Sequence, residues 1–70
     1  MAKIILAPNE SFEHFHSEDS TTILLDGSAN YRAGSVEYAL QRDVPVLTPA
    51  NQSHSIINTG AMECMFGCSH

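Results

Sequence analysis

The sequence has few basic residues, few cysteines, no tryptophan and no long apolar run. Lysine and arginine together number three, against eight acidic residues, which gives a net charge of −5. A nucleic-acid-binding surface needs clustered positive charge to replace the counterions of the phosphates, so this composition argues against DNA or RNA as a partner. No apolar stretch approaches the roughly 20 residues of a membrane-spanning helix, so we expect no membrane insertion and, by default, a cytoplasmic protein.

The two cysteines, Cys64 and Cys68, are too close in the sequence to brace the whole chain. In one extended strand their Cα atoms would lie roughly 13 Å apart, at about 3.3 Å per residue, which is beyond disulfide reach. This favours a reduced, intracellular protein. The chain of 70 residues is long enough for one domain, residues 1–70. Because a domain of this size buries only about 60% of its unfolded surface, we expect a metal ion or a partner subunit to add stability.

Turn-forming residues divide the chain into short segments that are rich in β-branched, aromatic and other apolar residues. Such segments, separated by Gly, Pro, Asn and Asp, are typical of an all-β sandwich or barrel. The segments that we expect to be strands are residues 3–7, 11–16, 21–25, 29–33, 36–41, 44–47, 54–58 and 62–67. No segment has the length and capping residues of a convincing helix.

Two histidines one residue apart, His14 and His16, stand out within the second segment. Residues i and i+2 of a strand point to the same face, so both imidazoles would project together. Two neutral nitrogen donors would then be within reach of one metal ion, and His54 from another strand would supply a third. The structural alternative is that each histidine is simply a hydrogen-bonded polar residue.

The last expected strand also has two faces with different compositions. Met62, Cys64, Phe66 and Cys68 share one face by parity, and Met65 lies on the other. An exposed Phe15 or Met65 would be unusual in a small monomer, and we interpret one or both of them as contacts of a homodimer. The final residues, 67–70, are expected to fray unless a partner or a metal ion holds them. The Cys-x-His tail formed by Cys68 and His70 is a weak metal-site signal, because two donors do not complete a tetrahedral set.

Two motifs in this order resemble those of the cupin family. The first family motif contains a His-x-His pair, a carboxylate and a glycine that closes the next turn, and here His14 and His16 precede Gly27 at that spacing. The second motif reads Pro-x-Gly-x-x-His-x-x-x-Asn, and the chain matches it at Pro49, His54 and Asn58. The resemblance covers residues 11–58, and two linked motifs are more specific than either alone.

The resemblance departs from the family pattern at two positions. Ser20 stands where the family has its metal-binding carboxylate, with Glu18 and Asp19 just before it. Asn51 stands in the glycine position of the second motif, and Asn tolerates a left-handed backbone better than most residues, so we expect the turn to survive. The family resemblance therefore implies a small antiparallel β-barrel or jelly roll with a three-histidine site.

A site of His14, His16 and His54 implies a divalent metal cofactor, with Fe, Mn, Zn, Ni and Cu all acceptable to imidazole ligands. Three protein ligands leave positions open for a small polar or anionic substrate, as in the three-histidine cupins that oxygenate thiols or diketones. The resemblance thus implies a metalloenzyme, an oxygenase or an isomerase. The alternative is a non-catalytic cupin that binds a small ligand or serves in assembly, with a degenerate metal site.

Four further residues are candidates for the ligand pocket of such a barrel. Each also has a structural interpretation: Ser20 as a small interior polar residue, Asn58 as a residue that fixes the next turn, Tyr31 as barrel wall or interface, and Cys64 as a small buried apolar residue.

Overall fold

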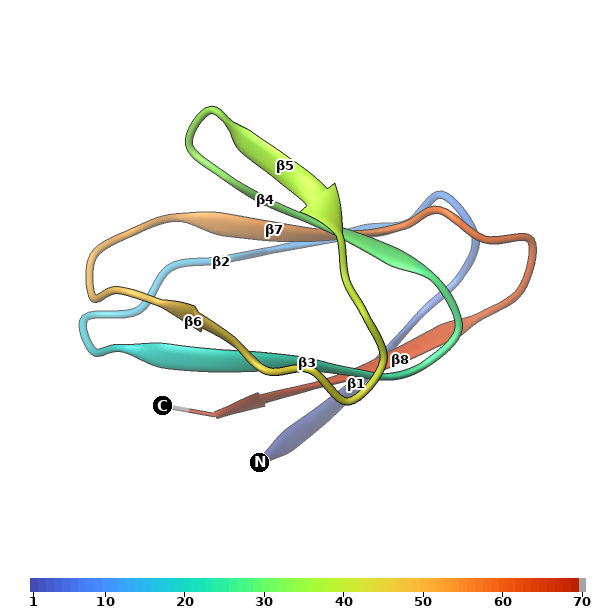
Figure 1. Ribbon diagram of the computed structural model, residues 1–70, viewed down its shortest axis with the longest axis horizontal. Coiled ribbons are helices and arrows are strands. Elements are labelled where there is room, and N and C mark those ends of the chain that lie inside the picture. The colour runs from blue at the N-terminus through green and yellow to red at the C-terminus, as the bar shows by residue number, and fades with distance from the viewer. Residues whose placement is uncertain (70) are drawn as a thin grey trace.

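The protein, described here by a computed structural model of residues 1–69, is built from eight β-strands. The strands are β1 (Ala2–Leu6), β2 (Ser11–His14), β3 (Ser20–Asp26), β4 (Ala29–Ala33), β5 (Val36–Ala39), β6 (Val46–Thr48), β7 (His54–Asn58) and β8 (Cys64–Ser69). They form two four-stranded sheets, with strand orders β1-β8-β3-β6 and β2-β7-β4-β5. The sheets lie one above the other, as Figure 1 shows, which confirms the predicted all-β fold.

Every pairing between neighbouring strands of the two sheets is antiparallel. Each of the eight expected strand segments overlaps a strand of the structure, with differences only at the ends. The described residues include no helix long and apolar enough to cross a membrane. The alternation of buried and exposed residues is clearest in β3, where Ser20, Thr22 and Leu24 all point inward. Because side chains alternate along a strand, these three line the space between the sheets.

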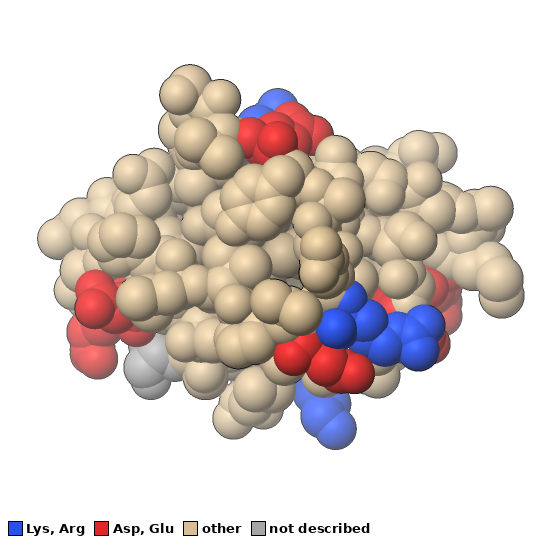
Figure 2. Space-filling view, in the orientation of Figure 1, with Lys and Arg blue, Asp and Glu red and all other residues tan. Residues whose placement is uncertain are grey.

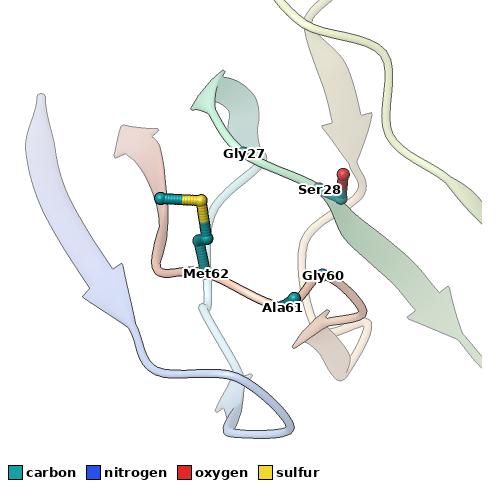
Figure 3. Close-up of a pocket in the computed structure, with 5 residues that line it drawn as sticks. All are labelled: Gly27, Ser28, Gly60, Ala61 and Met62. Carbon is teal, nitrogen blue, oxygen red and sulfur yellow. The ribbon is translucent and has the colours of Figure 1, made fainter.

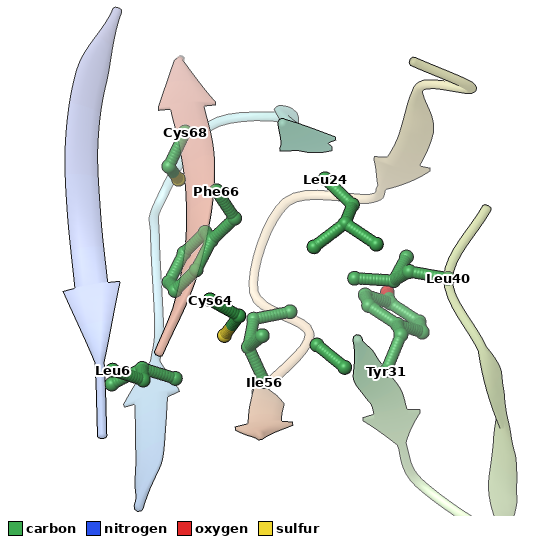
Figure 4. Packing of buried hydrophobic residues seen from close by; sticks show 9 residues of the cluster. Leu6, Leu24, Tyr31, Leu40, Ile56, Cys64, Phe66 and Cys68 are labelled. Atoms are coloured by element: carbon green, nitrogen blue, oxygen red, sulfur yellow. The ribbon is translucent and has the colours of Figure 1, made fainter. Parts of the chain in front are cut away.

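Most of the apolar core lies towards one end of the space between the sheets, whereas its members Cys68 and Tyr31 reach the histidines. Its largest fully buried members are Phe66 and Leu24 from one sheet and Ile56 from the other. Leu6, Ala29, Tyr31, Leu40, Cys64 and Cys68 complete the cluster of buried apolar residues, most of which Figure 4 labels. Burial of these side chains from both sheets is the main force that holds the layers together.

The other end of the same space is lined by polar residues. Ser20 pairs with Thr48, Thr22 pairs with Cys68, and His14 pairs with His54 in the registers of the two sheets. Ser20, Thr22, Thr48 and His54 are all buried. The interior is therefore apolar where β8 begins and polar where β8 ends.

Two turns depend on backbone conformations that few residues adopt. Gly27 follows β3 with a φ of 86°, and a Cβ at this position would lie 2.8 Å from the Cα of Cys64, so only glycine fits. Asn51 has a φ of 65°, as expected for the residue in the glycine position of the second motif. The turn that leads into β7 therefore survives with Asn in place of Gly.

The ends of β2 and β8 differ from the sequence-based expectation. β2 ends at His14, so His16 lies beyond the strand. β8 continues to Ser69, so the expectation that residues 67–69 fray is wrong, because they pair with β1 and β3. His70 lies outside the described residues. Met62 precedes β8 and is 78% exposed, so it does not join Cys64 and Phe66 on the inner face.

Charged side chains are sparse on the surface. In the view of Figure 2 most basic groups lie beside acidic ones, and no continuous basic area is seen on that face. One such neighbouring pair is Arg42 with Asp26, whose side chains are 3.9 Å apart and both exposed. An ion pair of this kind contributes little to stability because water screens it.

Candidate metal centre

The backbone brings the two motif regions together at the polar end of the barrel. His14, the last residue of β2, lies opposite His54, the first residue of β7. Beyond β2, the carbonyl of His16 accepts a hydrogen bond of 2.8 Å from the backbone N–H of Asn51. This bond fixes His16 to the loop before β7, so its side chain stays near His14 although the strand has ended.

Three side chains from the two sheets converge on a small volume. His14 Nδ1 lies 3.0 Å from His16 Nε2, and Cys68 Sγ lies 3.5 Å from His14 Nδ1 and 3.9 Å from His16 Nε2. All three ligand atoms lie within 4.8 Å of one another. These contacts are hydrogen bonds whose donors depend on the histidine tautomers.

The donor set and its spacing fit a metal ion. Two imidazoles and one thiolate are ordinary ligands of zinc and copper. Bond lengths of about 2.0–2.1 Å to nitrogen and about 2.3 Å to sulfur, in a tetrahedral arrangement, place nitrogens roughly 3.3 Å apart and nitrogen and sulfur roughly 3.6 Å apart. The observed separations of 3.0, 3.5 and 3.9 Å depart from those values by only a few tenths of an ångström.

His54 stands beside this cluster. Its ring centroid lies 5.7 Å from that of His14 and 5.9 Å from that of His16, and it stacks on the ring of Tyr31. The side chain is 2% exposed, and its Nδ1 is buried without a hydrogen bond to any described residue. His54 does not belong to the set of donors within 4.8 Å of one another, so joining a shared ion requires it to move towards the other two histidines. A buried imidazole nitrogen without a partner is costly, and a bound ion or ligand atom would satisfy it.

Burial governs the protonation of two side chains at the centre. It lowers the pKa of the His54 imidazole. The backbone of Gln52 raises this pKa by a smaller amount, and the nearby His16 lowers it further. Burial also raises the pKa of the Cys68 thiol, with a smaller opposite effect from the Thr22 hydroxyl. That hydroxyl makes no hydrogen bond of good geometry to a described residue, so it acts by proximity alone. His54 is therefore held in the neutral form that binds metals, whereas Cys68 must lose a proton to do so.

The carboxylates that precede Ser20 stay outside the centre. Asp19 accepts a hydrogen bond of 2.8 Å from the backbone N–H of Ala50 and so braces the loop between β6 and β7. Glu18 is exposed. Ser20 itself is buried at the start of β3, with no carboxylate to offer. Among the described residues, the cluster of metal-ligating atoms therefore contains no carboxylate.

The four pocket candidates lie at different ends of the barrel. Ser20 and Tyr31 are buried at the polar end of the barrel, and the Tyr31 hydroxyl shares a short hydrogen bond with Thr48. Cys64 lies in the apolar core at the start of β8 (Figure 4).

Asn58 lies at the same far end as Cys64. Its amide donates to the carbonyls of Leu6 and Met62, at 2.9 Å each, and accepts from the Gly60 N–H at 2.8 Å. These bonds hold the loop between β7 and β8 against the end of β1.

A cavity of about 240 Å³ lies at that far end and not at the metal centre. It is lined by Gly27, Ser28, Gly60, Ala61 and Met62, from the turn after β3 and the loop before β8 (Figure 3). The strands β3, β7 and β8 run between this cavity and the histidines. The cavity therefore has no part in the chemistry of the cluster.

Cys68 is the member of the cluster that sequence reasoning missed. The family motifs do not include it, and the sequence indicated it as a donor only in the weak Cys-x-His tail with His70, not together with His14 and His16. Strand parity did place it on the inner face with Cys64 and Phe66, and that was the signal that could have found it. Its contact with His14 spans 54 positions of sequence, so only the fold brings the two together.

A family model described as the cupin domain matches residues 2–69. The chain belongs to the cupin family. A cupin superfamily protein from Desulfitobacterium hafniense covers 96% of the chain at 20% identity, with a TM-score of 0.80. A predicted oxalate decarboxylase from Thermotoga maritima covers 94% of the chain at 25% identity, with a TM-score of 0.83. The cupin domain of a transcriptional regulator from Enterobacter cloacae covers 94% at 20% identity, also with a TM-score of 0.83.

The chain is shorter than several of these cupins. It spans 62% of the D. hafniense protein, 59% of the T. maritima protein and 73% of the E. cloacae domain. A Thermus thermophilus protein of similar fold, 24% identical and with a TM-score of 0.83, is matched over 65% of its length. No curated protein matches the chain. These likenesses establish the fold and family, while the chemistry depends on the residues of this chain.

The lowered pKa of His54 predicts how stability depends on pH. The unfolded state, with a histidine pKa near 6.5, takes up a proton before the folded state does, so stability is retained above about pH 6.5 and declines as the pH falls towards the folded pKa. Urea unfolding of chelator-treated protein should show this decline, at no more than about 1.4 kcal/mol per pH unit for one proton. His54→Gln should remove that part of it, and the same pH dependence in both proteins would contradict the assignment.

Proposed function

We propose that this cupin binds a divalent metal ion through His14, His16 and His54 and uses the site to bind a small polar or anionic molecule. The observation that carries the proposal is the convergence of imidazoles from β2 and β7, with ring centroids 4.5 to 5.9 Å apart. The buried Nδ1 of His54, which has no hydrogen bond to a described residue, supports the same conclusion. Such a site needs neutral imidazoles, and burial favours that form at His54.

The first candidate function is a metalloenzyme of the oxygenase or isomerase type. A bound divalent ion acts as a Lewis acid and holds a chelating substrate at its open positions. Around it, the stack of Tyr31 on His54 and the bond of Tyr31 to Thr48 would fix the imidazole in place. Ser20, buried at the start of β3, stands where the family has a carboxylate. The T. maritima relative, described as a predicted oxalate decarboxylase, makes a small dicarboxylic acid a reasonable first substrate to test.

The second candidate function is a non-catalytic module that binds a small ligand. The E. cloacae relative is a cupin domain of a transcriptional regulator, where such a domain need not catalyse a reaction. The missing carboxylate favours this alternative, because loss of a ligand is the expected first step towards a degenerate site. Either function suits a reducing compartment such as the cytoplasm, because Cys64 and Cys68 are both free thiols.

Metal content tests the proposal directly. Protein purified without chelator should retain close to one equivalent of a first-row divalent metal per chain, measured by elemental analysis. The His14→Ala variant should lose most of this metal, because the substitution removes one of the three proposed imidazole ligands. The matched control is Glu18→Ala, which removes an exposed side chain that does not belong to the cluster of metal-ligating atoms. Less than about a tenth of an equivalent in the unmodified protein would contradict the proposal.

The metal-loaded protein then separates the two candidate functions. Turnover of a small carboxylic acid or thiol, or oxygen uptake with it, would establish an enzyme. Binding of the same compounds without turnover would establish the ligand-binding module.

We also propose that two copies associate through the outer face of the sheet β1-β8-β3-β6. Ile5 is 59% exposed and lies beside the partly buried Met65 in the register of β1 and β8. Leu47 of β6 is exposed on the same sheet, and the Met1 side chain lies across Gly67. Phe15, the other expected dimer contact, is exposed beyond the end of β2. A second copy is the occupant that we propose because a domain of this size gains little stability from its own core.

Sedimentation at micromolar concentration should therefore show a dimer. Ile5→Glu should shift it towards the monomer, because a carboxylate would be buried in the apolar contact. Val36→Glu is the matched control, since Val36 is similarly exposed, at 54%, but lies on β5 of the other sheet. A folded monomer of the unmodified protein would contradict the dimer.

A further inference from the structure

We infer that Cys68 binds the metal ion as a thiolate, so that the centre is a mixed histidine and cysteine site. This inference rests on the proposed metal site and deepens it by naming a ligand that the cupin motifs of this chain do not contain. It also names the class of ion: zinc, cobalt or copper in preference to iron or manganese. The thiol proton leaves to solvent as the sulfur–metal bond forms, so the charge of the site falls by one.

The position of Cys68 carries the inference. It lies in β8, between β1 and β3, and its side chain is 4% exposed. Its sulfur points across the gap between the sheets to the two imidazoles that leave β2, at 3.5 Å from His14 Nδ1 and 3.9 Å from His16 Nε2. These separations lie close to the roughly 3.6 Å expected between nitrogen and sulfur ligands of one tetrahedral ion.

A comparison with Cys64 shows that only one of the two cysteines lies beside the histidines. Cys64 is on the same strand and the same inner face, four residues earlier, yet it lies in the apolar core with Phe66. Only Cys68 meets imidazole nitrogens, and only Cys68 belongs to the cluster of metal-ligating atoms among the described residues. The chain therefore contains one structural cysteine and one with the surroundings of a ligand.

Charge and donor chemistry indicate which ions fit. With Ser20 in the family's carboxylate position, three neutral histidines alone would leave the full charge of a divalent ion uncompensated in a partly buried site. A thiolate at Cys68 supplies one negative charge from the opposite sheet. Thiolates favour soft and borderline ions, whereas carboxylates favour manganese and magnesium.

Cobalt titration of the full chain provides the test. Cobalt(II) bound by a thiolate gives a charge-transfer band in the near ultraviolet, which ligation by nitrogen and oxygen alone does not give. We expect the band to rise to saturation at about one cobalt per chain and to disappear on addition of zinc. Because the sequence has two cysteines, retention of the full band in Cys64→Ala assigns it to Cys68 even if Cys68→Ser fails to fold.

If Cys68→Ser folds, it should lack the thiolate band and should bind zinc more than about tenfold more weakly. Loss of a group that only hydrogen-bonds to a metal ligand already weakens metal binding by about tenfold or more, and loss of a ligand should weaken it at least as much. Cobalt binding without a thiolate band would overturn the role of Cys68 and leave the three-histidine proposal standing. Loss of the band in Cys64→Ala would also overturn it. No binding of cobalt or zinc would instead overturn the proposed metal site itself, so the two failures are distinguishable.

Discussion

The structure depends on the contact between two small sheets that share one narrow interior. Burial of Phe66 and Leu24 against Ile56 holds the sheets together at one end. At the other end the sheets meet through polar side chains, with Cys68 of one facing His14 and His16 of the other. Such a polar contact costs free energy unless its groups are satisfied, and His54 Nδ1 is not satisfied by any described residue. A bound metal ion would satisfy these polar groups and would hold the two sheets together at the polar end as well.

The interior has an apolar end and a polar end, and the residues of the two cupin motifs are divided between these ends. Gly27 and Asn58 act at the apolar end, where one allows a close approach to Cys64 and the other holds the loop between β7 and β8. The histidines act at the polar end. The cavity between the turn after β3 and the loop before β8 is lined by none of the histidines.

Local patterns in the sequence were sufficient to predict the strands, because these follow from side-chain alternation and turn residues. The left-handed conformation at Asn51 was predictable for the same reason. The proximity of His14 and His16 was also predicted, but His16 lies beyond the end of β2 and is held by its backbone bond to Asn51. Cys68 was not predicted, because its importance comes from a neighbour 54 residues away and from β8 extending to Ser69. Met62 was wrongly placed inside, because the strand begins only at Cys64. Strand ends and contacts between sheets depend on tertiary packing, which a local pattern does not contain.

In the proposed centre, one metal ion joins the two sheets through nitrogen ligands from His14 and His16 and a sulfur ligand from β8. X-ray absorption at the zinc edge of the zinc-loaded, full-length protein measures those ligands without a substitution. We expect one sulfur at about 2.3 Å together with nitrogen ligands at about 2.0–2.1 Å. A first shell of nitrogen and oxygen alone would contradict this proposal.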